Sequence, residues 1–299
     1  MASYTTDTLI ESVRRRGHLT HSAGSIDLDD LVFLANEELQ TYVVQFLIQL
    51  RAEFNVSDHP IALTAGTSLY DLPSRAVGSE VRQVLRETTE NQFERILRVE
   101  PERILVPPQA NSGPTHYYFK DLQIGFTPCG GSNVIVQYFR RPGDLVLEVQ
   151  GAQVTAIDEM AGTVTLAAVP DTFTDAAEYD FTQARPPFRL LAMDQSATFV
   201  SNVMTLAEIP TGLAVGDWVT LAQESVIPQI PLVLHPFLAQ RTVVKALEAL
   251  GDARGEQFAK AALDEEGRLS RILVDRTQGS PRYIINRHGP GFRKFGRRF

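Results

Sequence analysis

Hydrophobic positions repeat with a helical period at both ends of the chain. From residue 27 to 54 apolar side chains recur every three or four positions, which predicts a long helix with one buried stripe. The stripe consists of Leu28, Leu31, Ala35, Leu39, Tyr42, Val43, Phe46, Leu47, Leu50 and Phe54. Further helices are expected over residues 5–16, 235–250 and 252–276. We expect the terminal helices to pack as a bundle, because neither end could bury its stripe alone.

Short strands replace the helical period in the middle of the chain. Residues 80–99 fit two strands around a polar turn, with a helix as the alternative, and residues 133–139 form a strand rich in β-branched and aromatic side chains. Five or six strands at roughly ten-residue spacing then predict an inserted barrel or sandwich. The fold class is therefore α+β. The expected domains are helical over 1–56 and 232–276, an antiparallel β region over 57–143, an inserted β-barrel or sandwich over 144–231, and an extended basic arm over 277–299.

Composition agrees with a folded protein and excludes several classes. Of the 299 residues, 43% are hydrophobic and 21% charged, which is enough apolar content for a sizeable core. The single cysteine, Cys129, excludes an internal disulfide and a cysteine-based zinc site. No apolar run approaches the roughly 20 residues of a membrane helix, and the first residues lack a secretory signal. We expect a protein of a reducing compartment with no membrane partner.

Charge divides the chain into two unlike parts. The net charge of −8 combines a body at −15 over residues 1–275 with a tail at +7 over residues 276–299, which has no acidic residue. The chain also uses 24 arginines against 4 lysines. Arginine suits interfaces because its planar group pairs with carboxylates and stacks on aromatic rings, although GC-rich coding would produce the same bias.

The basic tail has three interpretations. It could be a peptide that docks on an acidic partner, an arm that binds nucleic acid, or a solubilising end. Docking is favoured because the tail carries too many apolar side chains for a purely solvating segment. The predicted docking residues are Arg282, Tyr283, Ile284, Arg287, Phe292, Arg293, Lys294, Phe295, Arg297, Arg298 and Phe299.

Sequence motifs of catalysis are absent. The chain has no phosphate-binding GxxxxGK[ST] loop, no GxSxG elbow and no HExxH pair. A metal set could be drawn from His18, His21, Asp27, Asp29 and Asp30, but an exposed loop followed by helix-capping acids explains them better. We therefore expect no enzyme activity, no cofactor and no metal.

Two pairs of neighbouring acids and one histidine receive structural interpretations. The pairs Glu37–Glu38 and Glu265–Glu266 are predicted to be solvated surface, because adjacent residues of a helix point to different faces. His235 precedes a proline at the start of a helix, and we interpret it as a structural corner.

Three motifs together resemble the head-to-tail connector, or adaptor, proteins of tailed bacteriophages, of the tail-tubular or head-completion type. The motifs are a turn before a strand, the end of a later strand, and a proline-rich entry to the C-terminal helices. Their residues are Gly66, Thr67, Tyr70, Leu72 and Pro73; Tyr138, Phe139, Arg140 and Pro142; and Ile227, Pro228, Ile230, Pro231, His235 and Pro236. The resemblance covers most of residues 1–143 and 227–299.

This resemblance implies a structural virion protein of the head–tail neck, assembled in the bacterial cytoplasm. Family members form a ring, usually of twelve subunits, coaxial with the portal protein, and some insert a C-terminal arm into it. The implied partners are the portal, tail proteins below the ring, other copies of the chain, and double-stranded DNA that passes without sequence-specific binding. An acidic body would let DNA slide past.

Two other functions remain open from the sequence. The basic tail could make the chain a DNA-binding accessory protein. Alternatively, the inserted β segment could bind a receptor or glycan in a tail or baseplate, with Trp218 as its main stacking side chain.

Overall fold

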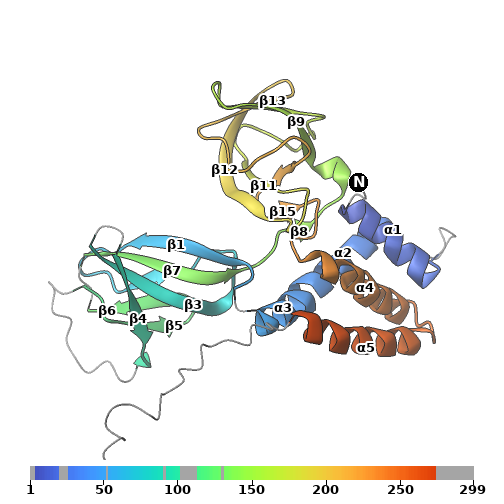
Figure 1. Ribbon diagram of the computed structural model, residues 1–299, viewed down its shortest axis with the longest axis horizontal. Coiled ribbons are helices and arrows are strands. Elements are labelled where there is room, and N and C mark those ends of the chain that lie inside the picture. The colour runs from blue at the N-terminus through green and yellow to red at the C-terminus, as the bar shows by residue number, and fades with distance from the viewer. Residues whose placement is uncertain are drawn as a thin grey trace, which may run out of the picture.

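Three lobes make up the chain in this computed structural model: a group of helices, a curved β-sheet and a closed β-barrel (Figure 1). The structure describes residues 4–19, 26–51, 53–89, 92–101, 113–128 and 131–273. The predicted α+β class with an inserted barrel is confirmed. Cys129 and the predicted arm over 277–299 lie outside the described residues.

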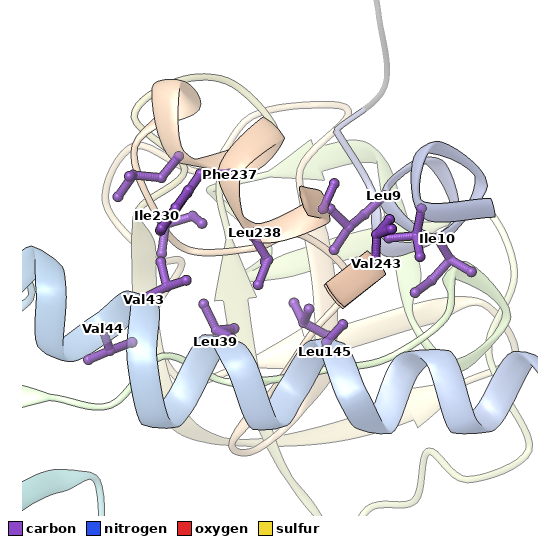
Figure 2. Close-up of a cluster of buried hydrophobic side chains, with 14 of the residues drawn as sticks. Leu9, Ile10, Leu39, Val43, Val44, Leu145, Ile230, Phe237, Leu238 and Val243 are labelled. Carbon is purple, nitrogen blue, oxygen red and sulfur yellow. The ribbon is translucent and has the colours of Figure 1, made fainter. Parts of the chain in front are cut away.

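Helices from the two ends of the chain share one core. They are α1 (Thr6–Gly17), α2 (Leu28–Glu38), the π-helical turn η1 (Leu39–Val43), α3 (Val44–Leu50), α4 (His235–Ala249) and α5 (Gly255–Leu273). Helix α4 is central, because it packs on α1, α2 and α5. Figure 2 shows Leu39 and Val43 of η1 pointing toward Phe237 and Leu238 of α4, with Leu9 and Ile10 of α1 beside them. The ends of the chain therefore depend on each other for burial.

The long helix predicted over residues 27–54 is interrupted and ends earlier than expected. Asp27 caps it, accepting a hydrogen bond from the Leu28 N–H at 2.6 Å, while Asp30 reaches back to the Asp27 N–H. The π-turn then widens the helix by one residue, so that Val43 and Val44 are both buried against the core. The helix ends at Leu50, and the chain continues into the first strand.

The first β region is a seven-stranded sheet. Its strands are β1 (Val56–Ala62), β2 (Leu69–Asp71), β3 (Ala76–Thr89), β4 (Gln92–Arg98), β5 (His116–Lys120), β6 (Gln123–Thr127) and β7 (Asn133–Arg140), in the order β1-β7-β3-β4-β5-β6-β2. The two-strand interpretation of residues 80–99 is confirmed, and the helical alternative is wrong. Val84 lies opposite both Ile96 and Val136, and these three side chains are buried on the inner face.

The inserted segment is a barrel and not a sandwich. Strands β9 (Ala152–Asp158), β10 (Thr163–Leu166), β11 (Glu178–Thr182), β12 (Leu190–Val200), β13 (Val203–Leu206) and β14 (Trp218–Leu221) close in the order β10-β13-β12-β11-β14-β9. Buried Tyr179 donates its hydroxyl to the Thr174 carbonyl at 2.6 Å, so the core leaves that hydroxyl satisfied. Below the barrel, β8 (Asp144–Leu145) and β15 (Glu224–Ser225) pair in parallel, and Asn36 of α2 hydrogen-bonds both backbone groups of Leu145.

One buried ion-pair cluster joins the sheet to the barrel. Arg75, in the turn between β2 and β3, forms a fork with Asp180 of β11 at 2.6 and 2.9 Å and reaches Asp194 of β12 at 2.5 Å. Arg75 is 5% exposed and Asp180 is fully buried. Burial opposes the guanidinium charge, but hydrogen bonds from Arg75 to Asp180 and the attraction of Asp180 and Asp194 outweigh it and raise the pKa of Arg75.

Hydrogen bonds hold the carboxylate of Asp180 in place for this fork. It accepts the backbone N–H groups of Gln223 at 3.0 Å and Asp194 at 3.1 Å. Asp194 has φ of +52°, a left-handed conformation that non-glycine residues seldom adopt. Strands β11 and β12 therefore meet at a single arginine, and the turn at Gln223 supports the carboxylate of Asp180.

Glu38 corrects the prediction that the Glu37–Glu38 pair is solvated surface. Glu37 is exposed, but Glu38 is 2% exposed and binds Arg241 of α4 at 2.7 Å. Arg241 in turn lies 3.8 Å from the centre of the Tyr42 ring. Glu266 is also half-buried, and it accepts the Tyr42 hydroxyl at 2.5 Å. The sequence could not show this, because the partners of these acids, Arg241 for Glu38 and Tyr42 for Glu266, lie on distant helices.

Removing Arg75 should destabilise the fold strongly. Arg75→Ala leaves the carboxylate of Asp180 buried without its counter-ion, and breaking a buried pair in this way costs about 3–5 kcal/mol. The free energy of unfolding measured with denaturant should fall by that amount.

Arg15→Ala is the matched control, since Arg15 pairs with Glu11 on the exposed face of α1. Loss of an exposed pair costs about 1 kcal/mol or less. Equal losses for the two variants would contradict the role given to Arg75.

Candidate assembly surfaces

The end of α5 is fixed on the helical lobe. Leu273, the last residue of α5, is 6% exposed, and its carbonyl accepts a hydrogen bond from Arg51 Nε at 2.8 Å. Arg51 directly follows α3, so the end of α5 lies beside the passage from the helices to the sheet. All eleven predicted docking residues, from Arg282 to Phe299, lie outside the described residues.

Negative charge is concentrated in the barrel. Residues 144–231 contain twelve acids and two arginines, a net charge of −10, whereas residues 57–143 contain nine of each sign. Several of these acids are exposed in turns and at strand ends: Asp158, Glu159, Asp171, Asp175, Glu178 and Glu208. The acidic body predicted from the sequence is therefore mainly an acidic barrel.

A groove of about 360 Å³ runs between α1 and the start of α4. Leu9, Leu232, Pro236 and Ala239 give it apolar walls, and the hydroxyls of Thr5, Thr8 and Ser12 line one side. Arg16 stands in this groove, with Nε 3.2 Å from Ser12 Oγ and Nη1 3.5 Å from the Pro236 carbonyl. It forms no ion pair with any other described residue.

His235 closes the groove from below and is a structural corner, as its place before Pro236 predicts. Its ring lies against Tyr4 and Phe188, at centroid distances of 5.7 and 4.9 Å, and its Nε2 is 3.2 Å from the Ile230 carbonyl. Burial lowers the pKa of His235 to about 4, against the smaller opposite effect of the Ile230 and Pro228 carbonyls. The ring is therefore neutral at pH 7 and acts as packing.

The outer face of α2 carries an exposed aromatic ring among acids. Phe33 is 68% exposed, and Asp29, Asp30 and Glu37 lie one turn away on the same side of the helix. None of the three carboxylates forms a salt bridge with another described residue. Phe33 falls outside the buried stripe that the sequence predicts, and an apolar side chain in that position is the available signal of an exposed contact.

In the part of the chain that the structure describes, no three His, Cys, Asp or Glu side chains are grouped as a metal site would require. No helix of that part is long and apolar enough to span a bilayer. His18 follows α1 in a left-handed conformation and ends that helix. His21, from the metal set considered above, lies outside the described residues.

Comparison with known families identifies the class as phage head–tail adaptor proteins. Residues 4–201 match the family described as SU10 adaptor protein. The match covers about two thirds of the chain, and the chain belongs to this family. Comparison with curated proteins gave no match.

The extent of the family match changes one expectation. The resemblance seen in the sequence skipped residues 144–226, but the match continues through the barrel to the end of β12 (Leu190–Val200). Four of the six barrel strands, β9 to β12, therefore belong to the family pattern. The proline-rich entry to α4, which contributed to the resemblance, lies beyond the matched residues.

Acid should destabilise the fold in part through His235. A histidine with a lowered pKa in the folded state contributes stability above the unfolded pKa of about 6.5, and this stability is lost as pH falls toward 4. From about pH 7.5 to about pH 5 the wild type should lose about 2 kcal/mol more than His235→Gln. Denaturant unfolding of both proteins across this range measures the difference, and parallel curves would contradict it.

Proposed function

We propose that this adaptor is a subunit of a ring that docks on the portal protein, joins it to the tail and lets DNA pass. Membership of the phage adaptor family over residues 4–201 carries the proposal. The ring, of twelve subunits by resemblance, would occupy the neck of the virion after assembly in the host cytoplasm. Partners on the head and tail sides would contact different lobes.

The C-terminal arm is the segment we assign to the portal. It combines basic and aromatic side chains without any acid, which suits pockets on an acidic protein surface. Its root is fixed by Leu273 in the core and by the Arg51 hydrogen bond, so that binding energy at the arm is transmitted to the helical lobe. If α5 were not fixed on the helical lobe, the arm could bind the portal without positioning the rest of the subunit.

The acidic barrel supports passage of DNA and weighs against storage of DNA on the body. A net charge of −10 over residues 144–231 repels phosphate, so a duplex near this lobe would slide and not adhere. This makes a DNA-binding accessory role depend on the tail alone.

The glycan-binding alternative relied on Trp218 as its stacking side chain, and this side chain is buried. Trp218 is 9% exposed and packs with Val146, Phe188 and Val226 at the base of the barrel. A sugar-stacking platform requires an open ring face, which this tryptophan lacks. The adaptor role therefore stands as the function best supported.

Deleting residues 281–299 should abolish portal binding without unfolding the chain. The deleted segment begins beyond α5, so the helical core should keep its thermal transition within a few degrees. Pull-down of purified portal by the truncated and full-length chains measures the effect. Normal binding by the truncation would overturn the docking assignment.

A second variant separates charge from aromatic contact. Replacing Tyr283, Phe292, Phe295 and Phe299 by serine keeps every positive charge of the arm. We expect portal binding to fall at least tenfold, because buried aromatic side chains dominate such contacts. Unchanged binding that disappears with added salt would show that charge alone holds the arm.

A further inference from the structure

We propose that Phe33 of one subunit inserts into the α1–α4 groove of the next subunit and forms the contact that links subunits head to tail. The inference rests on the proposed ring and names the surfaces that build it. Both surfaces lie within the described residues.

The inserted side chain is unusually placed for a lone subunit. Phe33 is one of the most exposed large apolar side chains of the helical lobe, at 68%. Large aromatic side chains at the centre of an interface are the groups that most often dominate its binding energy. Burying Phe33 would remove an apolar surface from water that its own chain leaves uncovered.

The receiving groove matches an aromatic ring in size and lining. Its volume of about 360 Å³ exceeds that of one phenyl ring. Leu9, Pro236 and Ala239 offer apolar contact, and Leu232 at the rim is 38% exposed in the single subunit. The ring of Tyr4 lies at the same wall and allows an edge-to-face contact.

Charges around the two surfaces are complementary. Phe33 stands among the carboxylates of Asp29, Asp30 and Glu37, whereas the groove holds the guanidinium of Arg16. Asp30 already accepts the Asp27 N–H, but Asp29 and Glu37 form no salt bridge with another described residue, and neither does Arg16. Insertion of Phe33 would bring Asp29 and Glu37 beside Arg16, which fixes orientation and disfavours wrong partners.

A second copy, and not the chain's own groove, must receive Phe33. Helix α2 packs on α4 through Leu31 and Ala35, which are fully buried, and Phe33 lies about 200° around the helix axis from either one. The side chain therefore points away from α4, which forms one wall of the groove. Two different surfaces that recognise each other produce a heterologous contact, and a ring results when its rotation closes.

Two single variants and their mixture test this contact. Phe33→Ser removes the inserted ring, and Arg16→Glu reverses the charge at the groove. Phe93→Ser on β4 is the matched control, since Phe93 is also exposed, at 47%, but lies on the sheet. Each protein is examined by sedimentation velocity at rising concentration, and its fold is checked by thermal unfolding.

The expected results are specific to a head-to-tail contact. Wild type and Phe93→Ser should form higher oligomers, while Phe33→Ser and Arg16→Glu should each associate about thirtyfold more weakly. An equimolar mixture of the two defective variants should stop at dimers, because only one intact pair of surfaces exists between them.

Each contrary result has a separate meaning. Oligomers of Phe33→Ser or Arg16→Glu as large as those of wild type would overturn the contact and leave the ring intact. Wild type that stays monomeric at every concentration and in the presence of portal would overturn the ring itself. A mixture that forms no dimer would show that the two surfaces do not meet.

Discussion

A buried fork between Arg75 and Asp180 is the contact on which the arrangement of the sheet and barrel depends. It joins a turn of the sheet to two strands of the barrel, and Asp194 adds a second carboxylate from its rim. Removing the charges of Arg75 and Asp180 from water is costly. The benefit of the buried pair here is that it selects one arrangement of the sheet and the barrel. In an adaptor, a fixed angle between the lobes would mean that a shift of one lobe moves the other with it.

The helical lobe ties the two ends of the chain together in a similar way. Helix α1 begins with Thr6, whose N–H and hydroxyl both bind the Val226 carbonyl at the exit of the barrel, and α4 then packs on α1. Helix α5 ends in this same lobe, where Leu273 is buried and accepts the Arg51 hydrogen bond.

Sequence patterns predicted the helices and strands well, but they did not predict the side-chain contacts between them. Periodicity identified the terminal helices and the inserted barrel, because burial imposes a repeat on each element separately. It could not pair Glu38 with Arg241, or Arg75 with Asp180, since these partners lie more than a hundred residues apart. The helical pattern did not predict a role for Phe33 either. Periodicity identifies apolar residues that lie on the buried stripe, and Phe33 lies outside that stripe.

The three parts of the chain differ in net charge, and this difference suits them to different partners. The barrel is strongly acidic, the sheet is neutral, and the arm is basic, so DNA and protein partners would meet different parts of one subunit. Electron microscopy of the full-length chain mixed with its portal protein is the direct test of the proposed ring. If the chain forms a ring on the portal, the particles should show an additional ring of density, coaxial with the portal and open at its centre. Portal particles without added density, beside compact unattached subunits, would contradict it.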